Sequence, residues 1–143
     1  MFILDTEIKS HKKKIMKTAL VYLALSLIAI IINYVYGLFG HGVHSASMTW
    51  MFLYPLLGGA VLYLLIFLLV PDIARFVAYR MFYNIYNSGI ATLSLGSFLK
   101  GIFDIAGTSS VYIAVFYAIG ELFVALGLVM LLVLAVNLKK SQA

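Results

Sequence analysis

Residues 48–70 read MTWMFLYPLLGGAVLYLLIFLLV, and no charged side chain occurs among them. A helix rises about 1.5 Å per residue, so roughly 20 apolar residues cross the hydrocarbon core of a bilayer. Two more runs have this length and character, at 18–36 and at 111–138, and the second contains one charge, Glu121. The sequence therefore predicts a multi-pass integral membrane protein.

The composition of the whole chain favours the same class. Of its 143 residues, 64% are hydrophobic and only 10% are charged, which leaves too little polar surface to cover a water-soluble globule. In hydrocarbon, backbone N–H and C=O groups must be paired internally, so only helices and closed barrels cross a membrane. The strands of a barrel alternate apolar and polar residues, and no such alternation runs through this chain. We expect an all-α fold in one domain, 1–143.

The segment between residues 71 and 110 mixes apolar and polar residues, and its two halves differ. From 72 to 84, polar residues recur at helical spacing opposite apolar ones, which is typical of an amphipathic helix at the membrane interface. From 85 to 106, the chain is moderately apolar, rich in Ser, Thr and Gly, and long enough to cross. We predict a fourth span there, and residues 72–84 are either a separate surface helix before it or the start of one long helix.

Charge placement supports this fourth span. If 85–106 crosses the membrane, nine of the ten basic residues lie on one side, and the positive-inside rule makes that side cytoplasmic, with both termini. The nine are Lys9, Lys12, Lys13, Lys14, Lys17, Arg75, Arg80, Lys139 and Lys140. Because the basic residues flank apolar spans, the net charge of +5 indicates contact with the lipid bilayer and not with nucleic acid.

Glu121 is the most informative polar residue within a predicted span. Ten residues from the start of its helix place its carboxyl about 15 Å deep, near the bilayer midplane, where a bare carboxylate costs several kcal/mol. Ala114, Ala118 and Ala125 share its helix face, and small residues allow close packing of a neighbouring helix. We expect Glu121 to meet the preceding helix and to bond to Thr92, Ser94 or a tyrosine hydroxyl.

The preceding helix carries a matching polar stripe at i, i+4 spacing. Its members are Ser88, Thr92, Gly96, Lys100 and Asp104. This stripe and the Glu121 face are interpreted either as a packing seam between two helices or as the lining of a path for a solute, ion or proton. Within the stripe, an ion pair between Lys100 and Asp104 is expected, one helical turn apart.

Two further features lie near the second span. His41, His44 and Met48 have the spacing of one helix side if that helix starts early, so they are candidate ligands for copper or haem. The interpretation that we favour is that the two histidines are interfacial residues that bind water and headgroups, because the usual third and fourth metal ligands are missing. Pro55, with Gly58 and Gly59, predicts a kink in the outer third of the second span.

The sequence contains no nucleophile-elbow, zinc-protease or nucleotide-binding signature, so no catalytic activity is expected. Our leading hypothesis is an accessory or oligomerising subunit of the cell membrane, which associates with copies of itself or with other membrane subunits. One alternative is a small proton-coupled transporter or channel that uses Glu121 in an oligomer. A second alternative is the handling of metal or haem at the outer loop. The sequence does not identify a cofactor.

Overall fold

The computed structural model describes the backbone of residues 2–142 and the side chains of residues 5–141, and every regular element among them is helical. In chain order these are α1 (Phe2–Phe39), α2 (Ala46–Trp50), the π-helix η1 (Tyr54–Val61), α3 (Leu62–Leu69), the 3₁₀ helix η2 (Pro71–Arg75), α4 (Val77–Ile105) and α5 (Tyr112–Gln142). The predicted all-α fold is confirmed for the described residues.

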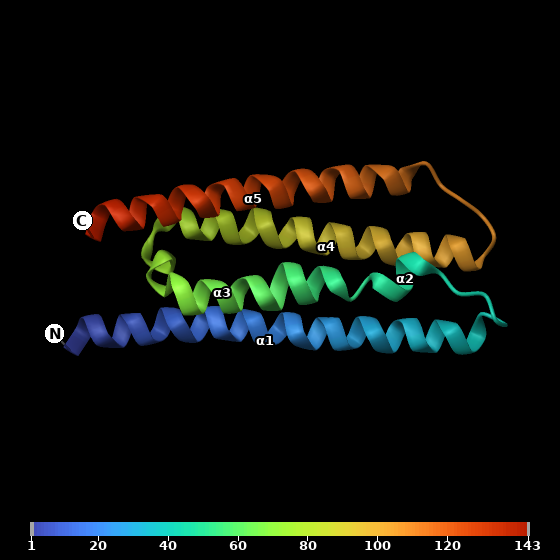
Figure 1. Ribbon diagram of the computed structural model, residues 1–143, viewed down its shortest axis with the longest axis horizontal. Helices are drawn as coiled ribbons and strands as arrows, with labels where there is room; N and C mark the ends of the chain where they lie inside the picture. Colours follow the sequence, from blue (N-terminus) through green and yellow to red (C-terminus); the bar gives the residue numbers. More distant parts are fainter. Residues whose placement is uncertain (1, 143) are drawn as a thin grey trace.

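The elements form four long rods that lie side by side (Figure 1). α1 packs on η1 and α3, which continue the rod begun by α2. This second rod contacts α4 through α2 and η1, and α4 makes its most extensive contact with α5. Both chain termini lie at one end of the molecule, which also holds the start of α4 (Figure 1).

Three helical segments are long and apolar enough to cross a membrane. They are Asp5–Phe39, Ala46–Leu69 and Tyr112–Ser141, which contain or nearly coincide with the predicted runs 18–36, 48–70 and 111–138. α4 contains nearly all of the predicted span 85–106 and is 29 residues long, but its Ser, Thr, Asn and Lys residues make it less apolar than the other three.

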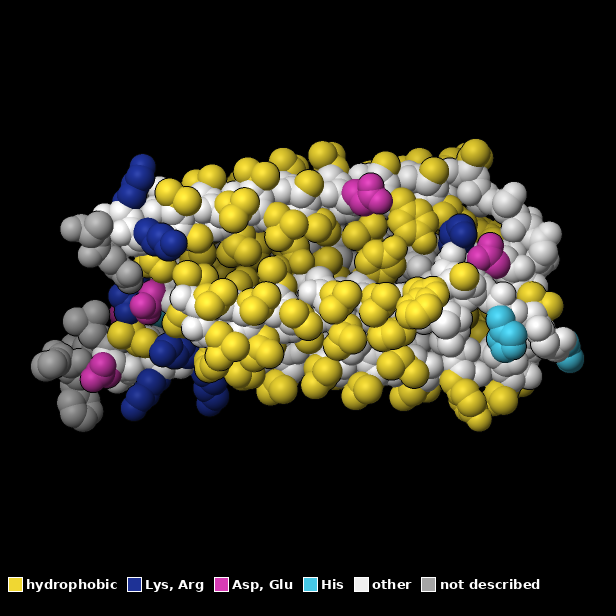
Figure 2. Space-filling model, viewed as in Figure 1, with side chains coloured by type: hydrophobic (Ala, Val, Ile, Leu, Met, Phe, Trp, Pro, Cys, Tyr) yellow, Lys and Arg dark blue, Asp and Glu magenta, His cyan; other side chains and the backbone are white. Residues whose placement is uncertain are grey.

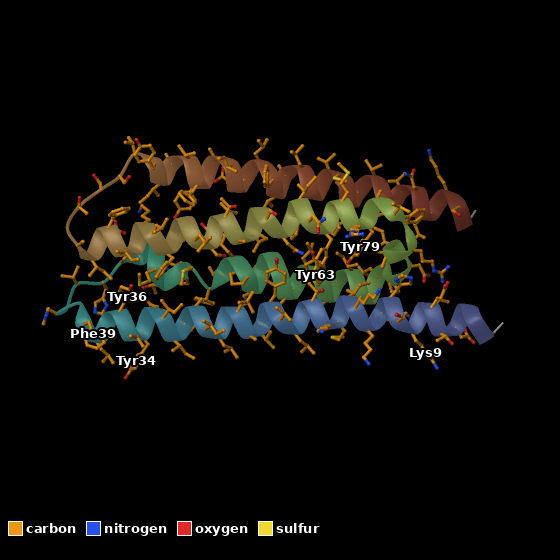
Figure 3. All side chains as sticks on the ribbon, turned by 180° about the vertical axis from the view of Figure 1, so that it is seen from behind. Lys9, Tyr34, Tyr36, Phe39, Tyr63 and Tyr79 are labelled. Carbon is orange, nitrogen blue, oxygen red and sulfur yellow. The ribbon has the colours of Figure 1, made fainter. Side chains whose placement is uncertain are left out.

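The surface agrees with membrane placement. Apolar side chains cover the long middle of the face shown in Figure 2, whereas most Lys and Arg side chains gather at one end. Tyr34, Tyr36 and Phe39 lie near one end of the rods, and Tyr79 lies toward the other end (Figure 3). Aromatic rings favour the two headgroup levels of a bilayer, so these positions suit an element that crosses it.

The predicted kink in the second span is confirmed. The chain leaves the α2 helix after Trp50 and resumes as η1, with Pro55 in its first turn. Proline has no N–H to donate, and π-turns leave backbone carbonyls poorly paired. The hydroxyl of Tyr86 on α4 donates a 2.6 Å hydrogen bond to the carbonyl oxygen of Gly58, which ties η1 to α4.

Residues 72–84 do not form a separate interfacial helix, and most of them belong to one long helix, which is the second of the two alternatives. Residues 71–75 form the 3₁₀ helix η2, Phe76 is extended, and α4 then runs unbroken from Val77. Ile73 is fully buried, so its side chain anchors η2 in the hydrophobic core between the helices. Residues 71–76 therefore leave the α-helix that their periodicity suggested, because burying the Ile73 side chain is favourable.

α4 and α5 approach closely because glycines lie between them. A Cβ atom added at Gly89 would lie 2.7 Å from the backbone nitrogen of Val124 and 3.0 Å from the carbonyl oxygen of Gly120. One added at Gly120 would lie 2.7 Å from Cγ of Leu93. Small residues at helix contacts allow such backbone proximity in membranes. These glycines fix which face of α5 turns toward α4.

Candidate functional site

A buried polar network joins three of the four rods. The hydroxyls of Tyr22 on α1 and Tyr63 on α3 each donate a 2.7 Å hydrogen bond to Oδ1 of Asn87 on α4. The two phenol rings stack, with centroids 5.8 Å apart and planes 12° apart. Tyr63 is completely buried. Both hydroxyls are satisfied by one amide oxygen, which locks α1, α3 and α4 in register.

Glu121 lies on the outside of α5, away from α4. Its side chain is exposed, as are Ala114, Ala118 and Ala125, and these four residues are named here the Glu121 face. The expected hydrogen bond to Thr92 or Ser94 is wrong. Thr92 donates to the carbonyl of Ser88, and Ser94 donates to the carbonyl of Ile90, each within its own helix.

The reason is the competition between two faces of α5. Gly120, which precedes Glu121 in the chain, is buried against Leu93 of α4, and Gly127 is buried against Tyr86. Packing glycines against large apolar side chains buries more surface than packing alanines around a carboxyl. The Glu121 face is therefore left for the surroundings of the molecule. Within residues 5–141, Glu121 makes no ion pair or hydrogen bond.

The end of the polar stripe that lies away from the chain termini, at Lys100 and Asp104, binds α2 and not α5. Lys100 Nζ lies 3.9 Å from Asp104 Oδ2, which confirms the predicted pair. Lys100 also donates a 2.9 Å bond to Ser47, and Ser45 donates a 2.6 Å bond to Asp104. Ser45 is the N-cap of α2. These charges hold the short helix against α4, which is a structural role.

The residues proposed to form one intramembrane polar face are thus divided among separate surroundings. Lys100 and Asp104 bond to the start of α2, and Thr92 and Ser94 bond to their own helix. Ser88 and Glu121 are exposed. No continuous polar path joins Glu121 to the stripe in the described part of the chain. Of these residues, Lys100 and Asp104 are the two whose side chains contact each other.

The three candidate metal ligands have different surroundings. His41 lies in a turn with a positive φ of 48° and is exposed, as is His44. Met48 is buried, at 1% exposure, against Gly101 of α4. α2 begins only at Ala46, so the helix that would align the three residues does not form at His41. The geometry gives the expectation of metal or haem handling no support.

Lysine, arginine and tyrosine side chains line a groove of about 790 Å³ between α1 and α4, here called the α1/α4 groove. It lies at the end of the molecule that holds both termini, and Tyr79, seen in Figure 3, lies on its wall. Lys14, Lys17 and Arg80 line it together with Tyr22 and Asn87 of the buried network. The groove has a volume typical of ligand sites.

Sequence reasoning missed both the network and the groove. It assigned the lysines to membrane orientation, since each residue was considered on its own helix. One signal was present: an asparagine within an apolar helix needs a hydrogen-bonding partner, and Tyr22 and Tyr63 are the hydroxyls in neighbouring spans at a similar depth.

No protein-family model, curated protein or solved structure is significantly similar to this chain.

Proposed function

We propose that this protein crosses the cell membrane four times with both termini in the cytoplasm, and that it is a non-catalytic subunit that associates with a second copy of itself through the Glu121 face. The observation that carries the proposal is the exposure of Glu121 in the apolar part of α5.

Four crossings are supported by the pairing of α4 with α5. The two helices pack along much of their lengths, so α4 spans the depth that α5 spans. Its polar residues face protein at several points, as in the bonds of Ser97 and Lys100 to Ser47. A helix shielded by two neighbours needs less apolar surface than one exposed to lipid on most sides. With four crossings, the basic end of the molecule is cytoplasmic.

Association is supported by the cost of leaving Glu121 in lipid. A charged side chain at mid-span costs roughly a few kcal/mol, and a protonated carboxyl without a partner still loses its hydrogen bonds to water. Ala114, Ala118 and Ala125 surround it, so a second helix can approach closely. A partner helix therefore removes a cost that the single chain does not remove internally.

A second copy is the simplest partner. In a two-fold symmetric contact the same face is used by both chains, so residues near the axis meet their own equivalents. Two Glu121 carboxyls that carry at least one proton form a donor and acceptor pair across that axis. The alanines then provide a close and symmetric contact on either side.

The experiment measures self-association of the full chain in liposomes by energy transfer between labelled copies. Glu121→Gln retains a donor and an acceptor and should associate nearly as well as the wild type. Glu121→Leu should weaken association about tenfold, as expected from loss of roughly 1–2 kcal/mol of hydrogen bonding in a membrane. Ala118→Trp should block it sterically.

Ile119→Trp is the matched control, because Ile119 is 43% exposed and lies one residue along α5, about 100° around the helix from Ala118. It should associate like the wild type. The proposal would be overturned by a monomeric wild type at high protein-to-lipid ratio. Equal association of wild type and Glu121→Leu would also overturn it, and association only with another membrane protein would replace self-assembly by an accessory role.

The proton-coupled transporter or channel uses the same carboxyl, so one variant separates the two functions. Glu121→Gln should leave assembly intact in both cases. Only a proton-carrying role predicts that it abolishes pH-dependent flux in liposomes. Absence of flux in wild type and variant, with assembly retained in both, leaves the subunit function.

A further inference from the structure

We propose that the α1/α4 groove is a binding site for one anionic phospholipid of the cytoplasmic leaflet. Its phosphate would lie among Lys14, Lys17 and Arg80, and an acyl chain would run toward Leu25 and Ala91. All of these residues line the groove.

The polarity of the groove changes in one direction along both walls. On α1, the lining proceeds from Lys14 and Lys17 to Val21 and Leu25. On α4, it proceeds from Arg80 to Ala91 over the same number of residues, about 16 Å of helix. Because α1 and α4 run in the same direction from the same end, the two charged ends coincide (Figure 1). The groove thus has the polarity of an amphiphile.

The charged end is complementary to an anion. Three permanent cations line it, with His11 beside them, and no Asp or Glu does. The ion pairs of the described residues are Arg75 with Asp72 and Lys100 with Asp104, so Lys14, Lys17 and Arg80 have no acidic partner among them. Unpaired cations at the cytoplasmic membrane surface attract anionic headgroups.

The middle of the groove offers a directed hydrogen-bond donor. Oδ1 of Asn87 already accepts from Tyr22 and Tyr63, at 2.7 Å each. Its Nδ2 group donates no hydrogen bond within the described part of the chain, and the residue lines the groove. An amide N–H₂ placed between a cationic and an apolar end matches the glycerol ester carbonyls, which lie between phosphate and acyl chain.

The apolar end is open to the side of the molecule. Val21 is 49% exposed and Leu25 is 45% exposed, although both are large hydrophobic residues on the groove wall. An acyl chain that enters sideways from the leaflet would cover them. A free phosphate or a soluble metabolite would leave this apolar half of the site uncovered.

The experiment uses the purified full chain in a neutral detergent at physiological salt, where charges farther apart than about 8 Å are largely screened. Bound lipid is counted by native mass spectrometry. Phosphatidylglycerol and phosphatidylcholine with identical acyl chains are the two probes. We expect one phosphatidylglycerol bound in preference to phosphatidylcholine.

Lys17→Gln combined with Arg80→Gln should weaken phosphatidylglycerol binding about thirtyfold, from the loss of two headgroup contacts. The matched control is Lys12→Gln with Lys13→Gln, which removes two charges from α1 outside the groove and should change binding less than threefold. Ala91→Trp should fill the apolar end and reduce binding while leaving all cations in place.

Three results would overturn the proposal. Equal binding of the two lipids would show that the headgroup charge is not recognised, and equal losses in the groove and control variants would reduce the effect to surface charge. Full displacement of lipid by inorganic phosphate would indicate a phosphate site without an acyl chain. Since the altered side chains lie outside the Glu121 face, a self-association assay on the same variants shows whether each still folds and assembles.

Discussion

The hydroxyl of Tyr63 on α3 lies 2.7 Å from Oδ1 of Asn87 on α4, although the two residues are 24 positions apart in the sequence. Tyr63 is fully buried, so this bond replaces one that water supplied in the unfolded chain. A second hydroxyl, from Tyr22, uses the same oxygen. The single side chain of Asn87 therefore decides how three helices meet.

Replacing Asn87 should cost more than replacing either tyrosine. Tyr63→Phe removes one bond and should lower the free energy of unfolding by about 1 kcal/mol. Asn87→Leu leaves two buried hydroxyls unpaired and should lower it by about 2–4 kcal/mol, at about 1–2 kcal/mol per unpaired group. Reversible unfolding in mixed micelles measures both.

The triple variant Tyr22→Phe/Tyr63→Phe/Asn87→Leu provides the control. It removes donors and acceptor together, so it should be more stable than Asn87→Leu alone. If Asn87→Leu were no less stable than Tyr63→Phe, the shared acceptor would not support the helix contact.

Gly89→Ala should separate α4 from α5. Its Cβ would meet the backbone nitrogen of Val124 at 2.7 Å, and backbone atoms cannot rotate away as a side-chain end can. We expect a loss of about 1–3 kcal/mol of stability, as for overpacking in a core. A thermal unfolding series in detergent measures the change.

Gly37→Ala is the matched substitution for that series. Gly37 also lies in a helix, but an added Cβ would approach nothing closer than 3.7 Å, at an imidazole carbon of His44. Alanine favours helix over glycine by about 1 kcal/mol, so this variant should be unchanged or slightly stabilised. Equal losses at both positions would contradict the close approach of α4 and α5.

Single cysteines should report four crossings, since the natural chain contains no cysteine. Val43→Cys and Ser109→Cys lie in the two connections at the end opposite the termini and should react with a membrane-impermeant maleimide on intact cells. Val77→Cys and Lys140→Cys should react only after permeabilisation. Matching behaviour of Ser109→Cys and Val77→Cys would mean that α4 does not cross.

Ser45→Ala should loosen α2. The Ser45 hydroxyl donates to Asp104 at 2.6 Å and its oxygen accepts from the backbone N–H of Met48. Loss of this cap should cost about 1 kcal/mol and speed hydrogen exchange of the amides in 46–50. Ser109→Ala changes an exposed serine between α4 and α5 and should leave those exchange rates unaltered.

Much of the fold follows from properties of single segments. The apolar runs at 18–36, 48–70 and 111–138 predicted three long helices because the length of an apolar run and the need to pair backbone groups are local matters. The kink at Pro55 followed from the missing N–H. The pairing of Lys100 with Asp104 followed from one turn of helix.

The orientation of each helix about its own axis was a different matter. Glu121 was expected to face α4, yet α5 presents Gly120 instead, because backbone approach and the burial of Leu93 depend on both helices at once. The same holds for Ile73, which is fully buried in η2, since the helical periodicity of 72–84 did not show that it would be. The spacing of residues shows which of them share a helix face, but it does not show which face packs against a neighbouring helix.

The α1/α4 groove and the Tyr22, Tyr63 and Asn87 network exist only in the tertiary structure. The members of the network lie 24 to 65 residues apart in the sequence, and the groove is lined by residues of both α1 and α4. Local chemistry was sufficient to predict the three helices that are long and apolar enough to cross a membrane. Which polar groups meet inside it was decided by close packing of several helices, where each contact depends on the positions of all the others.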